Sequence, residues 1–275
     1  MDPARCLPAR GETHLWYGGH DEPGAEPHRD LEVLSADERH RCARFSGRAD
    51  RARYAAAWAG VRRVLAGYLG GSPAALRFEH HGPFEGGEQR RQPYLRTGEG
   101  AALRISVARS EGRWLLALAV GDPVGVDLEH LRDFDTAGLI ERCLAPEERR
   151  RVNSLPAAER GDAFLRAWTR KEALMKAAAL PRGTAPHRLP VHPTRYGPVP
   201  VGLPGEPPQG PPGWTVRDLV LPSAAERAAL ARPLHCTGPV RWHDLAATGP
   251  PATGGPAAAA RHFAAATEKA AAPGA

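Results

Sequence analysis

The spacing of apolar residues predicts a long amphipathic helix in the first third of the chain. The residues that share its apolar face recur at intervals of three or four: Tyr54, Trp58, Val61, Leu65 and Leu69. Gly70 and Gly71 follow and are suited to end this helix. A shorter helix is expected before it, because Ser35 and Glu38 have the spacing of a capping box.

Apolar runs after this helix predict a β-hairpin and a further strand. Residues 103–109 (LRISVAR) and 113–120 (RWLLALAV) flank a turn near Ser110-Glu111-Gly112, which is the pattern of a hairpin. Residues 124–129 (VGVDLE) form a short run rich in β-branched residues, which predicts another strand.

The second half of the chain continues with helical segments and then strands. Helices are expected over 135–144, 146–153 and 157–180, and strands over 214–222 (WTVRDLVLP) and 231–238 (ARPLHCTG). This mixture of helices and strands predicts an α+β chain.

Composition limits the class of protein without deciding its function. The chain has 275 residues, a net charge of +6 and a pI near 9.5. This balance fits a nucleic acid, an anionic membrane, an acidic protein or a phosphorylated ligand as partner, and it fits equally an arginine-rich composition spread over solvated faces. The four cysteines have no paired spacing, so neither a zinc site nor a disulfide framework is expected. Without a long apolar stretch, we expect a cytoplasmic protein that binds no membrane.

Asp127 and Glu129 are candidate metal ligands. Residues two apart in a strand point to the same side, so the two carboxylates share a face while Val126 and Leu128 face the core. A bridging cation offsets the repulsion between such neighbours, and Mg²⁺ prefers carboxylate oxygens together with substrate phosphates. The alternative is an exposed strand edge with two solvated acids.

A second group of candidate residues lies on the expected helix 157–180. Phe164, Trp168, Glu172 and Lys176 are spaced by four, which predicts one stripe that begins in the core and emerges at a cleft. The alternative is an exposed Glu–Lys pair of the kind that is common on helices.

Taken together, the two segments resemble a known family. VGVDLE, followed about 40 residues later by WTRKEALMKA, resembles the two signature motifs of the phosphopantetheinyl transferase superfamily, and ERCLAPEE between them resembles its connecting segment. The resemblance implies Mg²⁺-dependent transfer of 4′-phosphopantetheine from coenzyme A to a serine of an apo acyl or peptidyl carrier protein, with release of adenosine 3′,5′-bisphosphate. The carrier would belong to a fatty-acid, polyketide or peptide synthase.

The resemblance also implies a role for each motif residue. Asp127, Glu129 and Glu172 would hold Mg²⁺, and Glu172 would accept the serine proton. Lys176 would stabilise the leaving phosphate, and Lys171 would help to hold the diphosphate.

The layout resembles the longer, surfactin-synthetase-activator type of this family. That type is a pseudo-dimer of two similar α/β halves in one chain, with the active site at their interface, and it favours a monomer. Here the implied parts are a flexible leader (1–13), a half that binds coenzyme A (14–124), a half with the metal and catalytic motifs (125–245) and a disordered tail (246–275).

Four residues of the first half are implied in coenzyme binding. Arg41 and Arg53 match basic positions of the family, and guanidinium groups suit phosphates. Arg109 and Ser110 stand where the family has a Ser-His-Ser-Gly element, so Arg109 replaces the histidine that contacts the ribose 3′-phosphate. Gln92 stands where the family tends to have a basic residue.

Three other functions fit parts of the sequence. The chain could be a degenerate family member that binds coenzyme A or carrier protein without transfer, because of the departures at Arg109 and Gln92. A Mg²⁺-dependent nuclease could use the same acids, and a basic module could bind nucleic acid. The chain has no P-loop and no recognised nucleic-acid-binding motif, so we expect no nucleic-acid partner.

Overall fold

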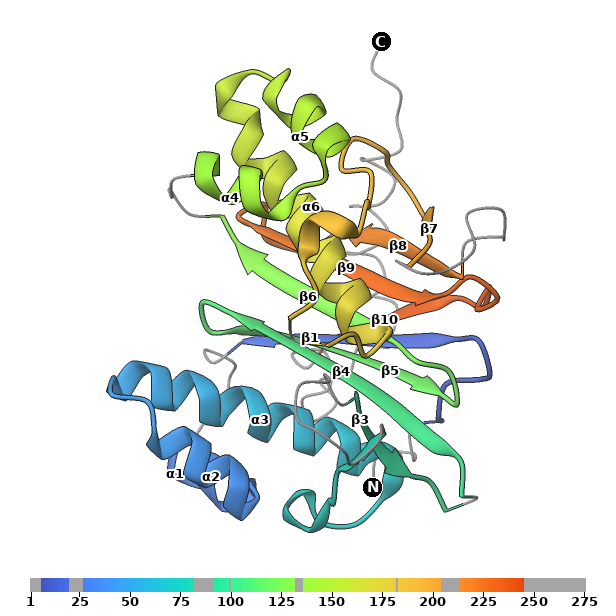
Figure 1. Cartoon of the computed structure of the whole chain (residues 1–275). Helices are drawn as coiled ribbons and strands as arrows, with labels where there is room; N and C mark the ends of the chain where they lie inside the picture. Colours follow the sequence, from blue (N-terminus) through green and yellow to red (C-terminus); the bar gives the residue numbers. More distant parts are fainter. Residues whose placement is uncertain are drawn as a thin grey trace, which may run out of the picture.

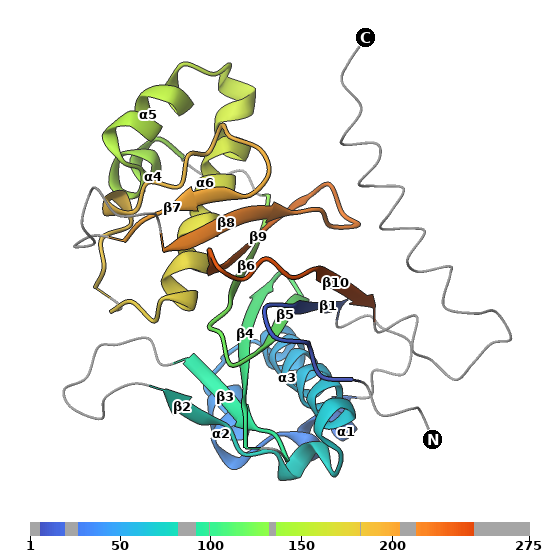
Figure 2. The same cartoon turned by 90° about the vertical axis from the view of Figure 1, so that its right-hand side faces the viewer.

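Two β-sheets form the middle of the molecule, and helices cover the outer side of each (Figures 1 and 2). The computed structural model describes residues 6–19, 27–81, 92–98, 100–131, 136–181, 183–203 and 213–244. The first sheet contains, in spatial order, β10 (Val240–Asp244), β1 (Thr13–Gly19), β5 (Arg113–Val120), β4 (Ala102–Ser110), β3 (Gln92–Arg96) and β2 (Glu79–His81). The second contains β6 (Gly125–His130), β9 (Glu226–Pro233), β8 (Trp214–Leu219) and β7 (Val199–Val201).

The helices form two groups, and in each group three α-helices are followed by one 3₁₀ turn. The first group is α1 (Pro27–Val33), α2 (Ala36–Ala43) and α3 (Arg48–Leu69), followed by the 3₁₀ turn η1 (Pro73–Ala75). The second group is α4 (Thr136–Cys143), α5 (Pro146–Asn153) and α6 (Ala157–Ala177), followed by η2 (Pro186–Arg188). No helix in the described ranges is long and apolar enough to cross a membrane.

Three apolar clusters hold four layers together. Val61 and Leu65 of α3 pack on the first sheet around Trp114. Phe164 and Leu174 of α6 belong to a second cluster, which covers the outer side of the second sheet. The third cluster lies between the sheets and joins side chains of β1, β4 and β5 to side chains of β6, β8 and β9. The order is therefore helix, sheet, sheet, helix, as Figure 1 shows.

Strand β6 lies along β4 of the other sheet and is joined to it through serine side chains. Ser106 Oγ accepts a hydrogen bond from the backbone N–H of Val126 (3.0 Å), and Ser110 Oγ accepts one from that of His130 (3.1 Å). Ala108 lies between the two serines on the same side of β4. Because all three residues are small, the edge of β6 approaches β4 closely and its backbone donors are satisfied.

Most of the predicted elements are confirmed. Ser35 and Glu38 form the predicted capping box at the start of α2, and Gly70, with φ of 75°, ends α3. The predicted hairpin is β4–β5, with Glu111 and Gly112 in its turn at positive φ. The predicted helices 135–144, 146–153 and 157–180 are α4, α5 and α6.

The prediction of a strand over 231–238 is wrong in its bounds, because the observed strand begins and ends five residues earlier. Strand β9 begins at Glu226 and ends at Pro233, and residues 234–238 form a turn. The segment Glu226–Arg232 is rich in Ala, Glu, Leu and Arg, which favour helices. Pairing with β6 on one side and β8 on the other outweighs this preference.

Three observations bear on the predicted division of the chain into leader, halves and tail. Strand β10, counted with the second half, pairs in parallel with β1 of the first sheet. Residues 1–5 of the expected leader and the expected tail 246–275 lie outside the described residues. Glu12, also counted with the leader, is buried and accepts a hydrogen bond from the backbone N–H of Ala9 (3.0 Å).

Candidate active site

Gly125 allows strand β6 and helix α6 to pack closely. A Cβ atom at this position would lie 2.0 Å from the carbonyl oxygen of Ala173 and 2.6 Å from the backbone nitrogen of Ala177. Both neighbours are helix backbone, so no side-chain movement could make room. The glycine therefore sets the distance between the strand with two candidate ligands and the helix with the third.

Asp127 and Glu129 both face α6, as the alternation of the sequence predicts. Val126 and Leu128 point the other way, into the cluster between the sheets. The Asp127 carboxylate accepts a hydrogen bond from Lys176 Nζ at 2.6 Å, and Glu129 Oε1 accepts one from Trp168 Nε1 at 3.2 Å. The predicted stripe on α6 begins in the core, since Phe164 is buried, and continues through Trp168, Glu172 and Lys176, which are half-buried.

The electrostatics of Asp127 are dominated by burial. Desolvation raises the pKa of this carboxyl from its usual 3.8 to about 6, against the opposing effect of the Lys176 ammonium. The negative charges of Glu129 and Glu172 raise the pKa further, so both carboxylates are near enough to act on Asp127. Asp127 Oδ2 is buried and has no hydrogen-bond partner among the described residues. A buried acceptor beside two further acids is a place where a cation would be stabilised.

The three carboxylates have the chemistry of a Mg²⁺ site. Mg²⁺ binds hard oxygen ligands, commonly through one or two carboxylates, and the unsatisfied Oδ2 of Asp127 supplies such an acceptor. In the described part of the chain, ligand atoms of Asp127, Glu129 and Glu172 do not all lie within 4.8 Å of one another. Asp127 and Glu129 are instead hydrogen-bonded to Lys176 and Trp168, which is expected for acids that repel one another.

A basic pocket lies on the first half of the molecule. Its volume is about 450 Å³, and it is lined by Arg41, Arg44, Phe45, Tyr54, Trp58 and Arg109. The Arg109 guanidinium lies over the Tyr54 ring at 4.8 Å. The Tyr54 hydroxyl is buried without a hydrogen-bond partner among the described residues. Three guanidinium groups beside aromatic rings suit a ligand that carries both a phosphate and a flat ring.

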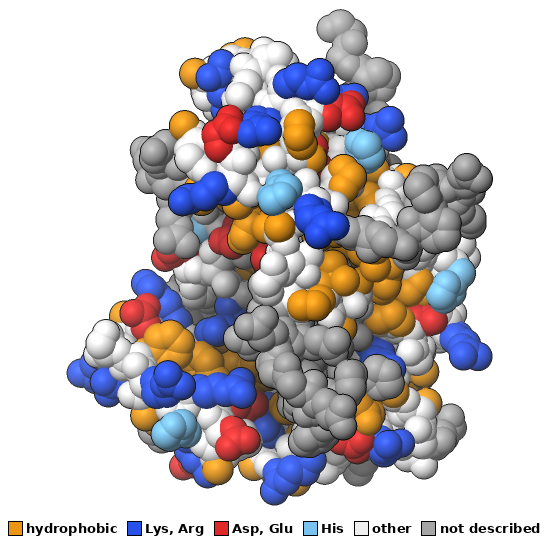
Figure 3. Space-filling view, in the orientation of Figure 1, with side chains coloured by type: hydrophobic (Ala, Val, Ile, Leu, Met, Phe, Trp, Pro, Cys, Tyr) orange, Lys and Arg blue, Asp and Glu red, His pale blue; other side chains and the backbone are white. Residues whose placement is uncertain are grey.

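Ser110 connects this pocket to the carboxylates. It follows Arg109 at the end of β4, and its hydroxyl binds the backbone of His130, the residue after Glu129. The pocket and the acids are therefore neighbours across the β4–β6 junction. In the space-filling view, acidic side chains are visible in a hollow between the part that contains α1–α3 and the part that contains α4–α6 (Figure 3).

Comparison with known proteins decides the family. The family model described as the 4′-phosphopantetheinyl transferase superfamily matches residues 123–210, which include both β6 and α6. The 4′-phosphopantetheinyl transferase HetI of Nostoc sp. (strain PCC 7120) is 34% identical over 169 residues, which cover 60% of this chain and 68% of the relative. The chain belongs to the 4′-phosphopantetheinyl transferase superfamily. The enzyme class of this family is phosphopantetheinyl transferase.

A second relative supports the same membership at lower identity. A 4′-phosphopantetheinyl transferase of Bacillus subtilis is 26% identical over 153 residues, which cover 56% of this chain and 63% of the relative. The similarity to these two curated proteins thus spans about two thirds of the length of each.

Lys171 of this transferase does not reach the carboxylates. Its side chain is fully buried, and Nζ donates to Glu148 Oε2 (2.6 Å) and to the carbonyl oxygens of Pro186 (3.1 Å) and Leu189 (2.5 Å). An ammonium group has three protons to donate, so these contacts use all of them. The predicted contact between Lys171 and a diphosphate is at odds with this arrangement, in which Lys171 joins α6 to α5 and η2.

The coenzyme residues are only partly brought together. Arg41 and Arg109 line the same pocket, and Ser110 adjoins it with its hydroxyl engaged by His130. Arg53 lies outside the pocket lining, with a long contact of 3.4 Å to Asp50. Gln92 begins strand β3.

Several residues of the transferase that contact the candidate site have no functional role predicted from the sequence. Trp168 binds Glu129, and its place on the stripe with Glu172 was the available signal. Arg44 and Trp58 line the pocket. Arg44 lies near Arg41, which was predicted to bind coenzyme, and Trp58 was predicted only as part of the apolar helix face. Their approach to Arg109 depends on the packing of α2 on α3 and of α3 on the first sheet, which no local pattern shows.

Proposed function

We propose that this transferase moves 4′-phosphopantetheine from coenzyme A to a serine of an apo carrier protein in a Mg²⁺-dependent reaction. The observation that carries the proposal is the meeting of Asp127 on β6 with Lys176 on α6, at 2.6 Å, with Glu129 and Glu172 close enough to act on Asp127. Carboxylates that can hold a cation, next to an ammonium, support a site at which a pyrophosphate is held and cleaved.

Coenzyme A is proposed to bind from the arginine pocket toward the carboxylates. Arg41, Arg44 and Arg109 offer charge for the nucleotide phosphate, and Tyr54 and Trp58 offer ring surfaces for the adenine. Ser110 marks the route from this pocket to Glu129, because its hydroxyl binds the neighbouring His130. The pyrophosphate would then lie between the pocket and Asp127.

A pseudo-dimeric layout supports an active site between two halves. Apart from β2 and β10, the first sheet has the order β1-β5-β4-β3, and the second sheet has the order β6-β9-β8-β7. When β2 is left out of the count, the strands of each half therefore lie side by side in the order first, fourth, third and second. Three helices follow the first strand in each half. We infer that the halves are internal repeats, with β10 added to the first sheet by the end of the second half. The predicted monomeric state and cytoplasmic location stay predictions.

Asp127, Glu129 and Glu172 are proposed to hold the metal. When bound, Mg²⁺ supplies charge neutralisation to the pyrophosphate oxygens. Glu172 accepts the proton of the attacking serine hydroxyl, which makes the oxygen a better nucleophile. Lys176 releases its hydrogen bond to Asp127 and donates to the leaving phosphate, because its side chain is a quarter exposed and can turn toward the ligand.

The second substrate is proposed to be an acidic carrier protein of a fatty-acid, polyketide or peptide synthase. The net charge of +6 favours approach of such a partner. On the face shown in Figure 3, Lys and Arg side chains occur over both helical groups, so the positive charge there is spread rather than gathered in one patch.

Intact mass tests the proposal directly. The purified protein is incubated with coenzyme A, Mg²⁺ and a panel of apo carrier proteins. We expect one carrier or more to gain about 340 Da, the mass of one phosphopantetheine group, and EDTA to abolish the gain. Asp127→Ala, Glu129→Ala and Glu172→Ala should each remove nearly all transfer while remaining folded. Glu147→Ala, which alters an exposed acid paired with Arg151, is the matched control.

Two results would count against the proposal. A folded Asp127→Ala variant with wild-type turnover would remove Asp127 from the metal site. Binding of coenzyme A without transfer to any carrier would favour the alternative of a degenerate family member. The reason to consider this alternative is that Arg109 replaces the histidine of the family.

A further inference from the structure

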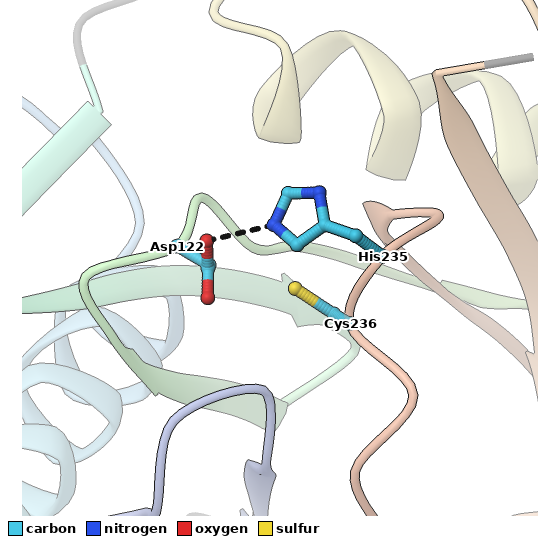
Figure 4. A group of neighbouring side chains, drawn as sticks. All are labelled: Asp122, His235 and Cys236. Carbon is cyan, nitrogen blue, oxygen red and sulfur yellow. Dashed lines mark hydrogen bonds and ion pairs between the residues drawn. The ribbon is translucent and has the colours of Figure 1, made fainter.

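Asp122, His235 and Cys236 form a cluster of possible metal ligands away from the carboxylates (Figure 4). Asp122 lies in the connection from β5 to β6, and His235 and Cys236 lie in the connection from β9 to β10. Since β5 and β10 belong to the first sheet and β6 and β9 to the second, both connections cross between the sheets. The cluster therefore lies where two crossings of the chain meet.

The three side chains converge with the spacing of a coordination sphere. His235 Nε2 lies 3.0 Å from Asp122 Oδ1, and one ligand atom from each residue lies within 4.8 Å of the other two. Figure 4 shows the imidazole and the thiol approaching the carboxylate from the same turn. Within the described residues, this is the group of three His, Cys, Asp or Glu side chains that meets this distance.

The backbone around the cluster is held in place by other contacts. Cys236 N donates to the carbonyl oxygen of Pro233 at 3.0 Å, which closes the turn. Gly238 packs on Gly11 so closely that a Cβ there would lie 2.6 Å from the Gly11 carbonyl oxygen. The Arg232 guanidinium donates to the Gly238 carbonyl at 2.9 Å. His235 and Cys236 are thus carried by a turn that is already positioned before any ion binds.

We propose that Asp122, His235 and Cys236 bind one Zn²⁺ ion. A thiolate, an imidazole and a carboxylate are the ligand types that select zinc, whereas the all-oxygen set of Asp127, Glu129 and Glu172 suits Mg²⁺. When the Zn–S bond forms, the Cys236 thiol gives its proton to solvent. The two anionic ligands then balance the charge of the ion, which matters because Arg232 lies nearby.

The remaining coordination position would face solvent. Cys236 is buried, but the His235 side chain is 70% exposed, so the cluster opens on that side. A water molecule can complete a tetrahedral sphere there. The ion would join the β5–β6 and β9–β10 connections and so stabilise the two sheets against each other. This inference does not depend on the proposed transfer activity.

Cobalt substitution gives a direct spectroscopic test. The full chain is stripped of metal, saturated with Mg²⁺ and titrated with Co²⁺, whose bond to a thiolate produces a charge-transfer band that carboxylate sites lack. The chain has four cysteines, so the thiolate that gives the band can be identified by substituting cysteines one at a time. We expect a one-to-one band that Zn²⁺ displaces. It should be lost in Cys236→Ser and retained in Cys6→Ser and Cys143→Ser.

A second variant guards against a misfolded Cys236→Ser protein. His235→Ala alters an exposed side chain, and we expect it to weaken Zn²⁺ binding by at least about 100-fold. This is the upper end of the effect of losing an outer partner of a ligand, which is about 10–100-fold. Zn²⁺ should raise the melting temperature of the wild type and raise that of His235→Ala much less. Absence of a thiolate band in the wild type, a band that survives Cys236→Ser, or equal zinc affinity in His235→Ala would each overturn the proposal.

Discussion

Substitution of Gly125 by alanine should separate the two elements that carry the proposed active site. The added methyl carbon would lie 2.0 Å from the Ala173 carbonyl oxygen and 2.9 Å from the Ala177 Cβ, far inside van der Waals contact. Overpacking of a core costs about 1–3 kcal/mol, and we expect about 3 kcal/mol here because helix backbone must move. For a chain of this size, that corresponds to a fall in melting temperature of about 6–12 °C.

The same shift should lower activity beyond the loss of stability. Glu172 and Lys176 are on the helix that must move, whereas Asp127 stays on the strand, so their mutual positions change. A misplacement of about 1 Å can reduce a rate by about 100-fold. Thermal unfolding and the carrier-modification rate, measured at a temperature where the variant is folded, give the two magnitudes.

Gly138→Ala is the matched control for this experiment. Gly138 lies within the short helix α4, where an added Cβ would meet nothing within 4 Å, so alanine should stabilise the protein slightly. A Gly125→Ala protein with wild-type melting temperature and wild-type rate would refute the reasoning that close β6–α6 packing positions the site.

Three further predictions test separate parts of the structure. Arg109→Ala should raise the KM for coenzyme A with a smaller change in kcat, whereas Arg53→Ala, outside the pocket, should change KM less; equal effects in steady-state kinetics would contradict the pocket assignment. Glu148→Gln should lower the free energy of unfolding in urea by about 3–5 kcal/mol, because it leaves the buried Lys171 charge unpaired. Ser106→Ala should lower it by about 1–3 kcal/mol by leaving the Val126 N–H unsatisfied, whereas the exposed Ser154→Ala should change it little.

The sequence predicted helices and strands well where the residues that decide the structure are close together in the chain. The Ser35–Glu38 capping box and the β4–β5 hairpin depend on residues close in sequence, so local physics decides them. Strand β9 shows the limit, because its Ala- and Glu-rich sequence favours a helix and only pairing with β6 and β8 makes it a strand. Its start at Glu226 could not be read from propensity.

Adjacent residues of the second motif show the same limit at the candidate site. Lys171 and Glu172 are neighbours on α6, but each residue of a helix turns about 100° from the last, so they face different surroundings. Glu172 faces the side of Asp127, and Lys171 enters the core against Glu148. Because Lys171 and Glu172 are adjacent in the motif, the sequence predicted a shared role for them. That Lys171 is paired with Glu148 follows only from the packing of α5 on α6.

The position of Asp127 depends on both halves of the molecule at once. Its strand is spaced from α6 through Gly125 and is bound to β4 of the other sheet through Ser106 and Ser110. The serines are four residues apart on β4, and the backbone groups they bind, at 126 and 130, are also four apart on β6. Two strands with this matched spacing run in the same direction and can shift only by breaking both bonds. The acids on β6 are therefore held in register with Arg109 and its pocket, so a change in the first half can reach the carboxylates without touching them.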